Sequence, residues 1–278
     1  MDSTRINKYV SDTGMCSRRE ADKLIEQGRV TINGKVVGPG SKVYSGNEVR
    51  VDGERIIRNV EPIIIAYNKP VGIVSTTDTK DPNNIIHAIN HPERIFPIGR
   101  LDKDSQGLIL LTNEGDIVNK ILRAGNKHEK EYVVTVDKAI TPDFIARMEK
   151  GVPILGVMTR KCKVVKKDRY VFNITLTQGL NRQIRRMCNF LGYKVERLMR
   201  IRIMHIKLGS LKPSRWRSLT PDEIEELYRK IESSVKTGDA LKSKKPTRKP
   251  QKPPIPSHVK IKGKRRATSR TTSPKNRQ

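Results

Sequence analysis

Residues 99–113, GRLDKDSQGLILLTN, form a short basic loop that is followed at once by an apolar run. The run from Leu108 to Leu111 predicts a buried strand. The loop before it carries the carboxylate of Asp102 between two cations, Arg100 and Lys103. This arrangement suits a carboxylate that is held rigidly at the edge of a sheet and faces a polyanion.

The segments around this stretch predict an α+β fold. Residues 63–67, 131–136 and 170–176 are rich in β-branched and aromatic residues, as strands are. Thr220-Pro221-Asp222-Glu223 is a helix start, with a capping residue, proline at the first position and glutamate at the third. Strands outnumber helices and do not alternate with them evenly. We therefore predict a domain over residues 61–232 with a mostly antiparallel mixed β-sheet flanked by helices.

Residues 1–60 read as a small basic module. Ser17-Arg18-Arg19-Glu20 is a capping box that precedes an apolar stripe at helical spacing. Asn33-Gly34 lies between two short β-type runs and predicts a type I′ hairpin. The cations Arg18 and Arg19 fit either a solvated helix face or a surface that binds RNA.

The composition points to a nucleic-acid partner. The net charge is +28 and the pI is near 10.3, which suits a polyanion. Residues 233–278 hold fifteen lysines and arginines and one acid, Asp239, so they contribute 15 − 1 = +14. Without Phe, Trp or Tyr, this basic tail is expected to be disordered and to attract RNA phosphates.

Several functional classes are not expected from the sequence. No apolar run is long enough to span a bilayer, and the N-terminus lacks the apolar core of an export signal. Three widely spaced cysteines without a CxxC pair argue against disulfides and zinc. We expect a cytoplasmic protein that uses neither a metal nor a cofactor and acts as a monomer.

The candidate catalytic residues are not unique on chemical grounds alone. Asp102 and Asp104 are both loop carboxylates, and a loop aspartate more often caps a turn. Tyr132 lies on a predicted strand and is either a core residue or a platform for a base. In the predicted helix that Asn181 caps and Gly192 ends, Arg182 and Arg186 lie opposite the apolar stripe. Arg185 lies at the flank of that stripe, from which it can reach a half-buried carboxylate.

Three motifs resemble those of the ribosomal-RNA pseudouridine synthases: the GRLD loop, the Lys130-Glu131-Tyr132-Val133-Val134 strand, and LTQGLNRQIRRM at residues 176–187. The resemblance implies that Asp102 is the nucleophile, that Tyr132 stacks on the extruded uracil and that Arg185 pairs with Asp102. It also implies an apolar pocket wall at Leu176 and a structural turn at Asn68-Lys69-Pro70-Val71-Gly72, in which Lys69 is not catalytic. The residues expected to contact RNA are Arg100, Leu101, Lys103, Arg182, Gln183, Ile184, Arg186, Arg18 and Arg19.

The order of the N-terminal module is similar to that of the S4 RNA-binding domain. An S4 domain before this catalytic domain marks the branch that modifies small-subunit RNA (type A) and large-subunit RNA (types B, E and F). Within that branch the motifs and the basic tail look most like the F type. The resemblance thus implies a large-subunit ribosomal RNA substrate and permits a tRNA as a second one.

Two alternatives come from other classes. S4 modules also occur in non-catalytic RNA-binding and ribosome-assembly proteins, but such a protein has no need for Asp102, Tyr132 and Arg185 together. Another RNA-modifying enzyme would show other signatures. A methyltransferase needs a glycine-rich cofactor loop, and a deaminase needs an H-x-E motif with C-x-x-C. Neither pattern is present.

Overall fold

The computed structural model describes residues 3–57, 61–122 and 128–232. The disorder predicted for residues 233–278 concerns a segment outside these ranges. Within the described residues, no helix is long and apolar enough to cross a membrane.

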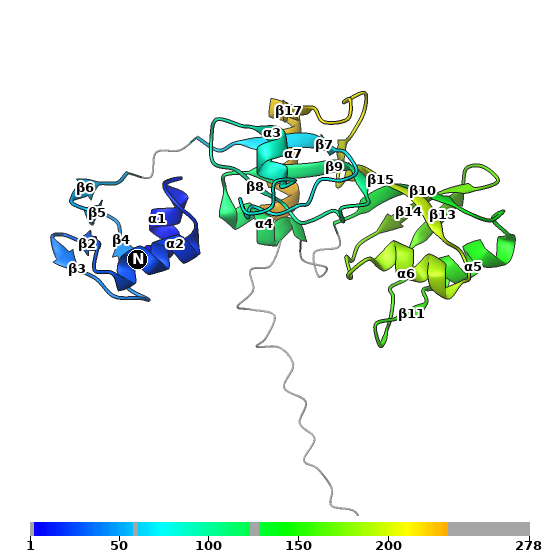
Figure 1. The fold of residues 1–278 in the computed structure, drawn as a ribbon, viewed down its shortest axis with the longest axis horizontal. Helices are drawn as coiled ribbons and strands as arrows, with labels where there is room; N and C mark the ends of the chain where they lie inside the picture. Colours follow the sequence, from blue (N-terminus) through cyan, green and yellow to red (C-terminus); the bar gives the residue numbers. More distant parts are fainter. Residues whose placement is uncertain (1–2, 58–60, 123–127, 233–278) are drawn as a thin grey trace, which may run out of the picture. The chain divides into compact units, whose positions relative to one another are not determined.

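Residues 3–57 form the predicted module of two helices and short strands (Figure 1). The elements are β1 (Ser3–Arg5), α1 (Ile6–Asp12), α2 (Arg18–Glu26), β2 (Val30–Ile32), β3 (Lys35–Val36), β4 (Lys42–Tyr44), β5 (Val49–Val51) and β6 (Glu54–Arg55). Strand β1 pairs with β4, and the other strands form a sheet in the order β3-β2-β5-β6. The apolar faces of both helices, including Ile6, Val10 and Ile25, pack on these strands.

The local signals of this module act as predicted. The Ser17 hydroxyl accepts a hydrogen bond from the Glu20 backbone N–H at 3.2 Å, and the Glu20 carboxylate accepts one from the Ser17 N–H at 2.7 Å. These two bonds satisfy donors that the first turn of α2 leaves open. Asn33 and Gly34 have φ values of 51° and 78°, as a type I′ turn requires.

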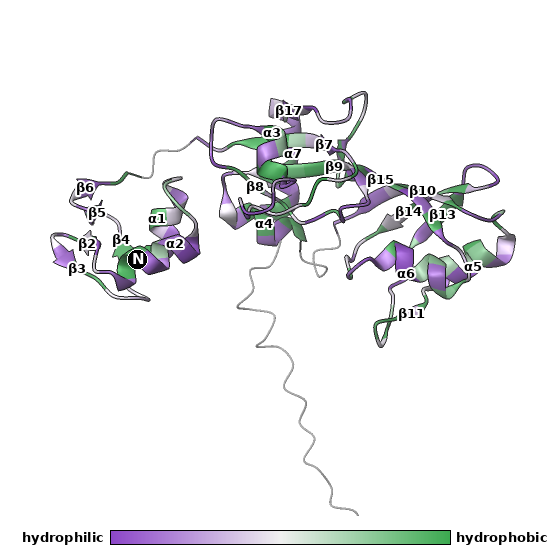
Figure 2. Ribbon diagram, viewed as in Figure 1, coloured by the Kyte–Doolittle hydropathy of each residue, from purple (hydrophilic) through white to green (hydrophobic). Residues whose placement is uncertain are grey.

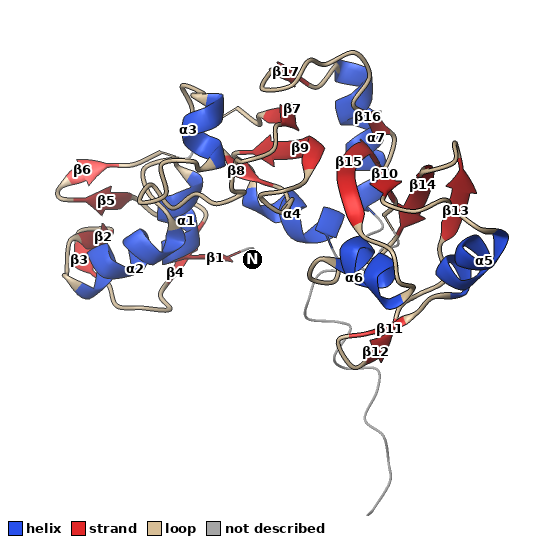
Figure 3. Ribbon diagram, turned by 45° about the vertical axis from the view of Figure 1, so that its right-hand side comes forward, coloured by secondary structure: helices blue, strands red, loops and turns tan. Residues whose placement is uncertain are grey.

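The larger part of the chain is built on one mixed sheet (Figure 3). Its strands are β7 (Ile64–Lys69), β8 (Phe96–Pro97), β9 (Gln106–Thr112), β10 (Lys130–Val136), β13 (Lys163–Lys166), β14 (Val171–Leu176), β15 (Val195–Ile203), β16 (Ile206–Lys207) and β17 (Trp216–Ser218). Its helices are α3 (Ile85–Ile89), α4 (Gly115–Leu122), α5 (Pro142–Lys150), α6 (Gln183–Phe190) and α7 (Pro221–Glu232), and a small hairpin joins β11 (Pro153–Ile154) to β12 (Val157–Met158).

The main path of the sheet runs β13-β14-β10-β15-β9-β7-β17. Every pairing along it is antiparallel except that of β15 with β9, so the predicted α+β fold is confirmed. The parallel contact is short, because only Met199↔Gln106 and Arg200↔Gly107 are paired.

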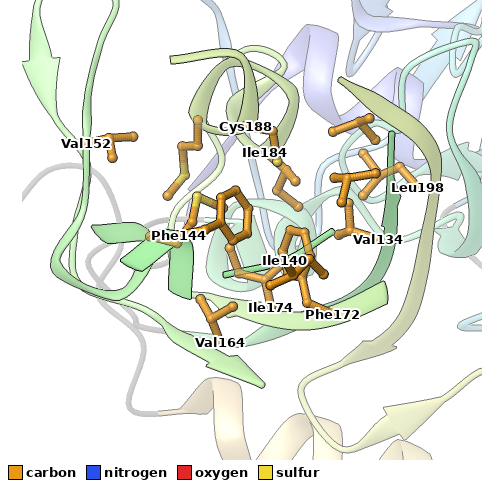
Figure 4. Packing of buried hydrophobic residues seen from close by; sticks show 14 of the residues in the cluster. Val134, Ile140, Phe144, Val152, Val164, Phe172, Ile174, Ile184, Cys188 and Leu198 are labelled. Carbon is orange, nitrogen blue, oxygen red and sulfur yellow. The ribbon is translucent and has the colours of Figure 1, made fainter. Parts of the chain in front are cut away.

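The two halves of this sheet are covered differently. In the β7–β9 half, α4 and α7 pack on one face and α3 packs on the other. Strand β7 is therefore buried along its whole length, and β9 is hydrophobic over most of it (Figure 2). In the other half, α5 and α6 cover one face, where Phe144, Ile184 and Cys188 meet Val134 and Phe172 (Figure 4). Strand β14 accordingly alternates between buried and half-buried residues.

A row of paired residues crosses the sheet from one half to the other. Lys69 pairs with Gly107 in the register, Gly107 with Arg200, and Arg200 with Tyr132. Residues that are directly opposite each other in neighbouring strands share a face of the sheet. This row therefore brings Arg200 and Tyr132 to the face on which the GRLD loop lies.

Candidate active site

A cavity of about 460 Å³ opens at the junction of the two halves of the sheet. It is lined by residues from the GRLD loop, from β10, β14 and β15, and from the start of α6. Among the predicted site residues, the cavity brings together Arg100, Leu101, Asp102, Tyr132, Arg182, Gln183 and Ile184, with Leu176 on its wall. Segments more than 80 residues apart in the sequence thus meet around Asp102.

Hydrogen bonds to its backbone fix the GRLD loop on the side of residues 72–75. The buried hydroxyl of Ser75 donates to the Leu101 carbonyl at 2.9 Å and accepts from the Leu101 N–H at 3.2 Å. Gly72 N–H donates to the Lys103 carbonyl at 2.8 Å. The turn at residues 68–72 therefore packs near the loop, as expected, whereas Ser75 was not anticipated. These bonds bracket Asp102 on both sides and hold its side chain, which is one-third exposed, at the cavity.

The buried side chain of Lys69 binds the backbone of the same turn. Its side chain is fully buried, and its ammonium donates to the carbonyls of Pro70 and Ile73 at 2.8 and 2.7 Å. Burial lowers the pKa of Lys69 to about 8, against the opposing effect of Asp104 and Asp102. Its two carbonyl partners give Lys69 a structural task, in line with the expectation that it is not catalytic.

Helix α6 starts differently from the prediction. Asn181 was expected to cap the helix, but the residue at that position is Arg182, in the left-handed conformation with φ 48° and without a side-chain capping bond. The Asn181 amide oxygen instead accepts a hydrogen bond from Arg186 at 3.2 Å. The Gln183 amide oxygen accepts one from the Leu180 backbone N–H at 3.0 Å. Gly192 follows the helix with φ 80°, as expected for its end.

Because Arg182 precedes the helix in a left-handed conformation, its side chain lines the cavity. Arg182 grips the Asp104 carboxylate through two bonds of 3.0 and 2.9 Å, and its Nη1 lies 3.6 Å from Asp102 Oδ2. The helical projection had put Arg182 on the solvent face, but the left-handed residue lies before the helix and does not follow that projection. Among the described residues, Arg182 is the cation that pairs with Asp102.

Arg185 reaches the loop at a different point from the one expected. It lies at the half-buried flank of α6, as predicted, yet it contacts Asp104 and not Asp102. Its Nη2 donates to the Asp104 carbonyl at 2.9 Å, its Nη1 donates to the Val195 carbonyl at 3.1 Å, and its Nε lies 3.3 Å from the Asp104 carboxylate. Arg185 thus ties the loop to α6 and β15. The bonds from Arg182, aided by the charge of Arg185, lower the pKa of Asp104.

Tyr132 lies on the cavity wall and contacts both halves of the domain. It is half-buried and packs against the core around Phe172 as well as against the core around Tyr67. Leu176 pairs with Lys130, which lies two residues before Tyr132 on β10 and on the same face of the sheet. The tyrosine ring and the leucine side chain therefore give the cavity two apolar surfaces.

Two cations in the cavity wall were missed from the sequence. Lys130 and Arg200 both line the cavity, and they are only 8% and 3% exposed. The register of β10 against β15 shifts between Glu131 and Tyr132, which turns Arg200 toward Tyr132 while Arg202 pairs with Glu131. No pattern in residues 195–203 distinguishes Arg200 from Arg197 or Arg202, so only the pairing reveals it.

The remaining predicted RNA contacts lie outside the cavity. Lys103 is exposed in the loop beside Asp102, and Arg186 is exposed on α6, where it binds back to Asn181. Arg18 and Arg19 are exposed in the first turn of α2. All four are accessible to a ligand from solvent.

Comparison with known proteins shows the family of the chain. Residues 63–190 match the family model described as RNA pseudouridylate synthase, and residues 4–49 match the S4 domain. A solved structure described as a pseudouridylate synthase covers 80% of this chain and 99% of its own, with a TM-score of 0.60 and 31% sequence identity. With the relatives below, these matches show that the chain belongs to the RNA pseudouridine synthase family, whose members are isomerases, and that it carries an S4 domain.

Particular relatives cover most of the chain. The dual-specificity RNA pseudouridine synthase RluF of Salmonella typhi is 54% identical over 98% of this chain and 96% of its own. The enzyme of the same name from Escherichia coli K12 is 59% identical, over 84% of this chain and 81% of its own. The ribosomal large subunit pseudouridine synthase B of Bacillus subtilis is 35% identical, over 80% and 95%. The resemblance to the F type is therefore confirmed.

Proposed function

We propose that this chain isomerises a specific uridine of large-subunit ribosomal RNA to pseudouridine and that it also modifies a tRNA. Two relatives, 54% and 59% identical to this chain, are named dual-specificity RNA pseudouridine synthases. The observation that carries the proposal is the placement of the Asp102 carboxylate at a cavity that also presents an aromatic ring and several cations. We propose that the protein works in the cytoplasm as a monomer, without metal or cofactor.

The proposed reaction begins with binding and extrusion of the base. The unit of residues 1–60 and the tail of residues 233–278 hold RNA phosphates, and residues 61–232 carry out the chemistry. Flipping the uridine out of its stack costs a few kcal/mol. Arg100, which is exposed at the rim of the cavity, fills the space that the base leaves. Stacking on Tyr132 and contact with Leu176 offset part of the cost, since base stacking on an aromatic ring contributes about 1 to 3 kcal/mol.

Asp102 then acts as the nucleophile. Covalent capture divides a difficult bond exchange into two easier steps. Arg182 supplies the neighbouring positive charge, with its Nη1 at 3.6 Å from Asp102 Oδ2. Arg185 orients Asp102 through the Asp104 backbone, and so replaces the direct pairing that the resemblance implied.

The decisive experiment maps pseudouridine in ribosomal RNA and tRNA from cells that lack the gene. Complementation with the wild type restores the missing marks, whereas Asp102→Asn restores none and still binds RNA. Asp168→Asn, at an exposed loop position between β13 and β14, is the matched control and restores them fully. Restoration of a mark by Asp102→Asn would show that Asp102 is not the nucleophile.

A further inference from the structure

Lys130 and Arg200 are buried cations without a carboxylate partner among the described residues. The Lys130 ammonium donates one hydrogen bond, to the His128 carbonyl at 3.2 Å. Arg200 donates from Nε to the Leu108 carbonyl at 2.6 Å, and its Nη2 is buried without a hydrogen-bond partner. A buried charge is costly unless it is paired, and removal of a polar group from water without a partner costs about 1 to 3 kcal/mol.

The two cations lie on the same wall as the ring on which the base is proposed to stack. Arg200 is paired with Tyr132 across β15 and β10, and Lys130 is two residues from Tyr132 on the same face. Lys130 and Arg200 are also close enough for their charges to interact. A flat apolar ligand with negatively charged oxygens at its edge fits a wall with this mixture of an aromatic ring, Leu176 and two cations.

Such a ligand forms during the isomerisation. When the C1′–N1 bond breaks, its electron pair stays on uracil, so that the detached base is an anion with its charge spread over N1 and the two carbonyl oxygens. Asp102, the proposed nucleophile, forms an ester bond to C1′ as the bond to N1 breaks. The base then turns, and C5 supplies the pair for the new bond to C1′ and displaces the Asp102 carboxylate. The C5 proton leaves and N1 gains a proton. The product is an isomer of the substrate, and the sequence needs no outside oxidant or reductant.

We propose that Lys130 and Arg200 hold the carbonyl oxygens of the extruded uracil and stabilise its negative charge while the base is detached from the ribose. The assignment rests on the proposed function and adds a receptor for the leaving group to the nucleophile at Asp102. Fixed charges in a water-excluded site stabilise a developing charge more strongly than water does. An RNA phosphate is the less suitable occupant, because both cations are almost fully buried in a cavity wall that they share with Tyr132 and Leu176.

Protonation of Lys130 gives a first test. Burial and the charge of Arg200 lower the pKa of Lys130 to about 8. The charged form exists below that pKa, so kcat should fall as the pH rises through about 8. Other ionisable groups that face this region are Asp102, Arg100, Arg182, Tyr132 and His128, and Lys69 has a pKa that is also lowered to about 8. Lys130→Arg separates these effects, because arginine remains charged at that pH.

A change of leaving group gives the second test. The substrate is a transcript spanning the uridine found by mapping, made once with uridine and once with 5-fluorouridine. Lys130→Met should lower the rate of glycosidic bond cleavage about 100-fold on uridine, as loss of one preorganised donor does in other sites, with KM unchanged. Fluorine withdraws electrons and makes uracil a better leaving group, so the deficit should shrink on 5-fluorouridine. Arg202→Gln is the control. Arg202 lies on β15, as Arg200 does, but it pairs with Glu129 and Glu131, so this variant should retain wild-type rates.

The outcomes distinguish this proposal from the proposed function. If the wild type converts uridine while Lys130→Met has the same deficit on both substrates, or affects only KM, the leaving-group role is wrong and the proposed function stands. If the wild type converts no uridine, the proposed function itself fails. Thermal unfolding shows whether Lys130→Met is folded. If it is not, the pH profiles decide, and retention of the alkaline fall by Lys130→Arg overturns the proposal.

Discussion

The backbone of Arg200 passes so close to Gly107 that a β-carbon at position 107 would lie 2.3 Å from the Arg200 carbonyl oxygen. Gly107 also has a φ of 104°, a conformation that other residues rarely adopt. This is the point at which the two halves of the sheet meet in their parallel contact. The last glycine of the GRLDKDSQG stretch is therefore required by packing, independently of any chemistry at Asp102.

Gly107→Ala should lower the free energy of unfolding by about 3 kcal/mol, because backbone strain and a steric clash act together. Gly192→Ala is the control, since Gly192 also has a positive φ, of 80°, but has no atom within 4 Å of an added β-carbon. It should cost about 1 kcal/mol, the strain of the left-handed conformation alone. Urea denaturation measures both. Equal losses would mean that the close approach to Arg200 relaxes without cost.

Ser75→Ala should reduce both stability and turnover. It leaves the N–H and the carbonyl of Leu101 without partners in a buried position, at a cost of about 2 kcal/mol. Because Asp102 is the next residue, turnover under saturating RNA should fall by about tenfold or more. Ser218→Ala, at an exposed strand position, should change neither quantity. Full turnover in a destabilised Ser75→Ala protein would show that Ser75 does not position Asp102.

Arg185→Ala should lower single-turnover rates more than Arg182→Ala does. Arg185 bonds to the Asp104 and Val195 carbonyls and is mostly buried, so its loss displaces the loop, and a misplacement of about 1 Å can cost about 100-fold. The contact of Arg182 with Asp102 is longer and more exposed, so we expect a loss of about tenfold. A larger loss for Arg182→Ala would show that the contact between Arg182 and Asp102 matters more than the anchoring of the loop by Arg185.

Arg18→Ala and Arg19→Ala should weaken RNA binding and leave the fold intact. Both side chains are exposed on α2, and a phosphate contact contributes to affinity through release of counterions. Each substitution should reduce the slope of log affinity against log salt by about 1. Lys35→Ala, at an exposed position of β3 outside the predicted set, should leave the slope unchanged. A slope that is unaffected by either arginine would favour a solvated helix face.

Local signals were enough to predict much of the fold. The capping box at Ser17, the Asn33-Gly34 turn and the apolar run of β9 each depend on neighbouring residues only, and each forms as predicted. The contact of the 68–72 turn with the Asp102 loop was also anticipated, from the resemblance of its motif.

The missed features depend on pairing between distant segments. Arg200 faces the cavity because a register shift between β10 and β15 turns it there, and alternation within β15 contains no information about that shift. Ser75 acts from a stretch without helical or strand periodicity. Arg182 departs from the helical projection because its backbone is left-handed. Each of these features depends either on an interaction between residues far apart in the chain or on a backbone conformation that no periodic pattern predicts.

The division of the catalytic domain into two separately packed halves has a consequence for partly unfolded molecules. Asp102 comes from the half built around β7 and β9, whereas Arg182, Arg185 and the α6 helix come from the half built around β10 and β14. The two halves enclose separate apolar clusters, and β15 and β9 join them through two pairs of residues. If one half unfolds, the Asp102 carboxylate is separated from Arg182 and Arg185, so the proposed active site exists only while both halves are folded. Under the proposed mechanism, a molecule with one unfolded half can therefore bind RNA without modifying it.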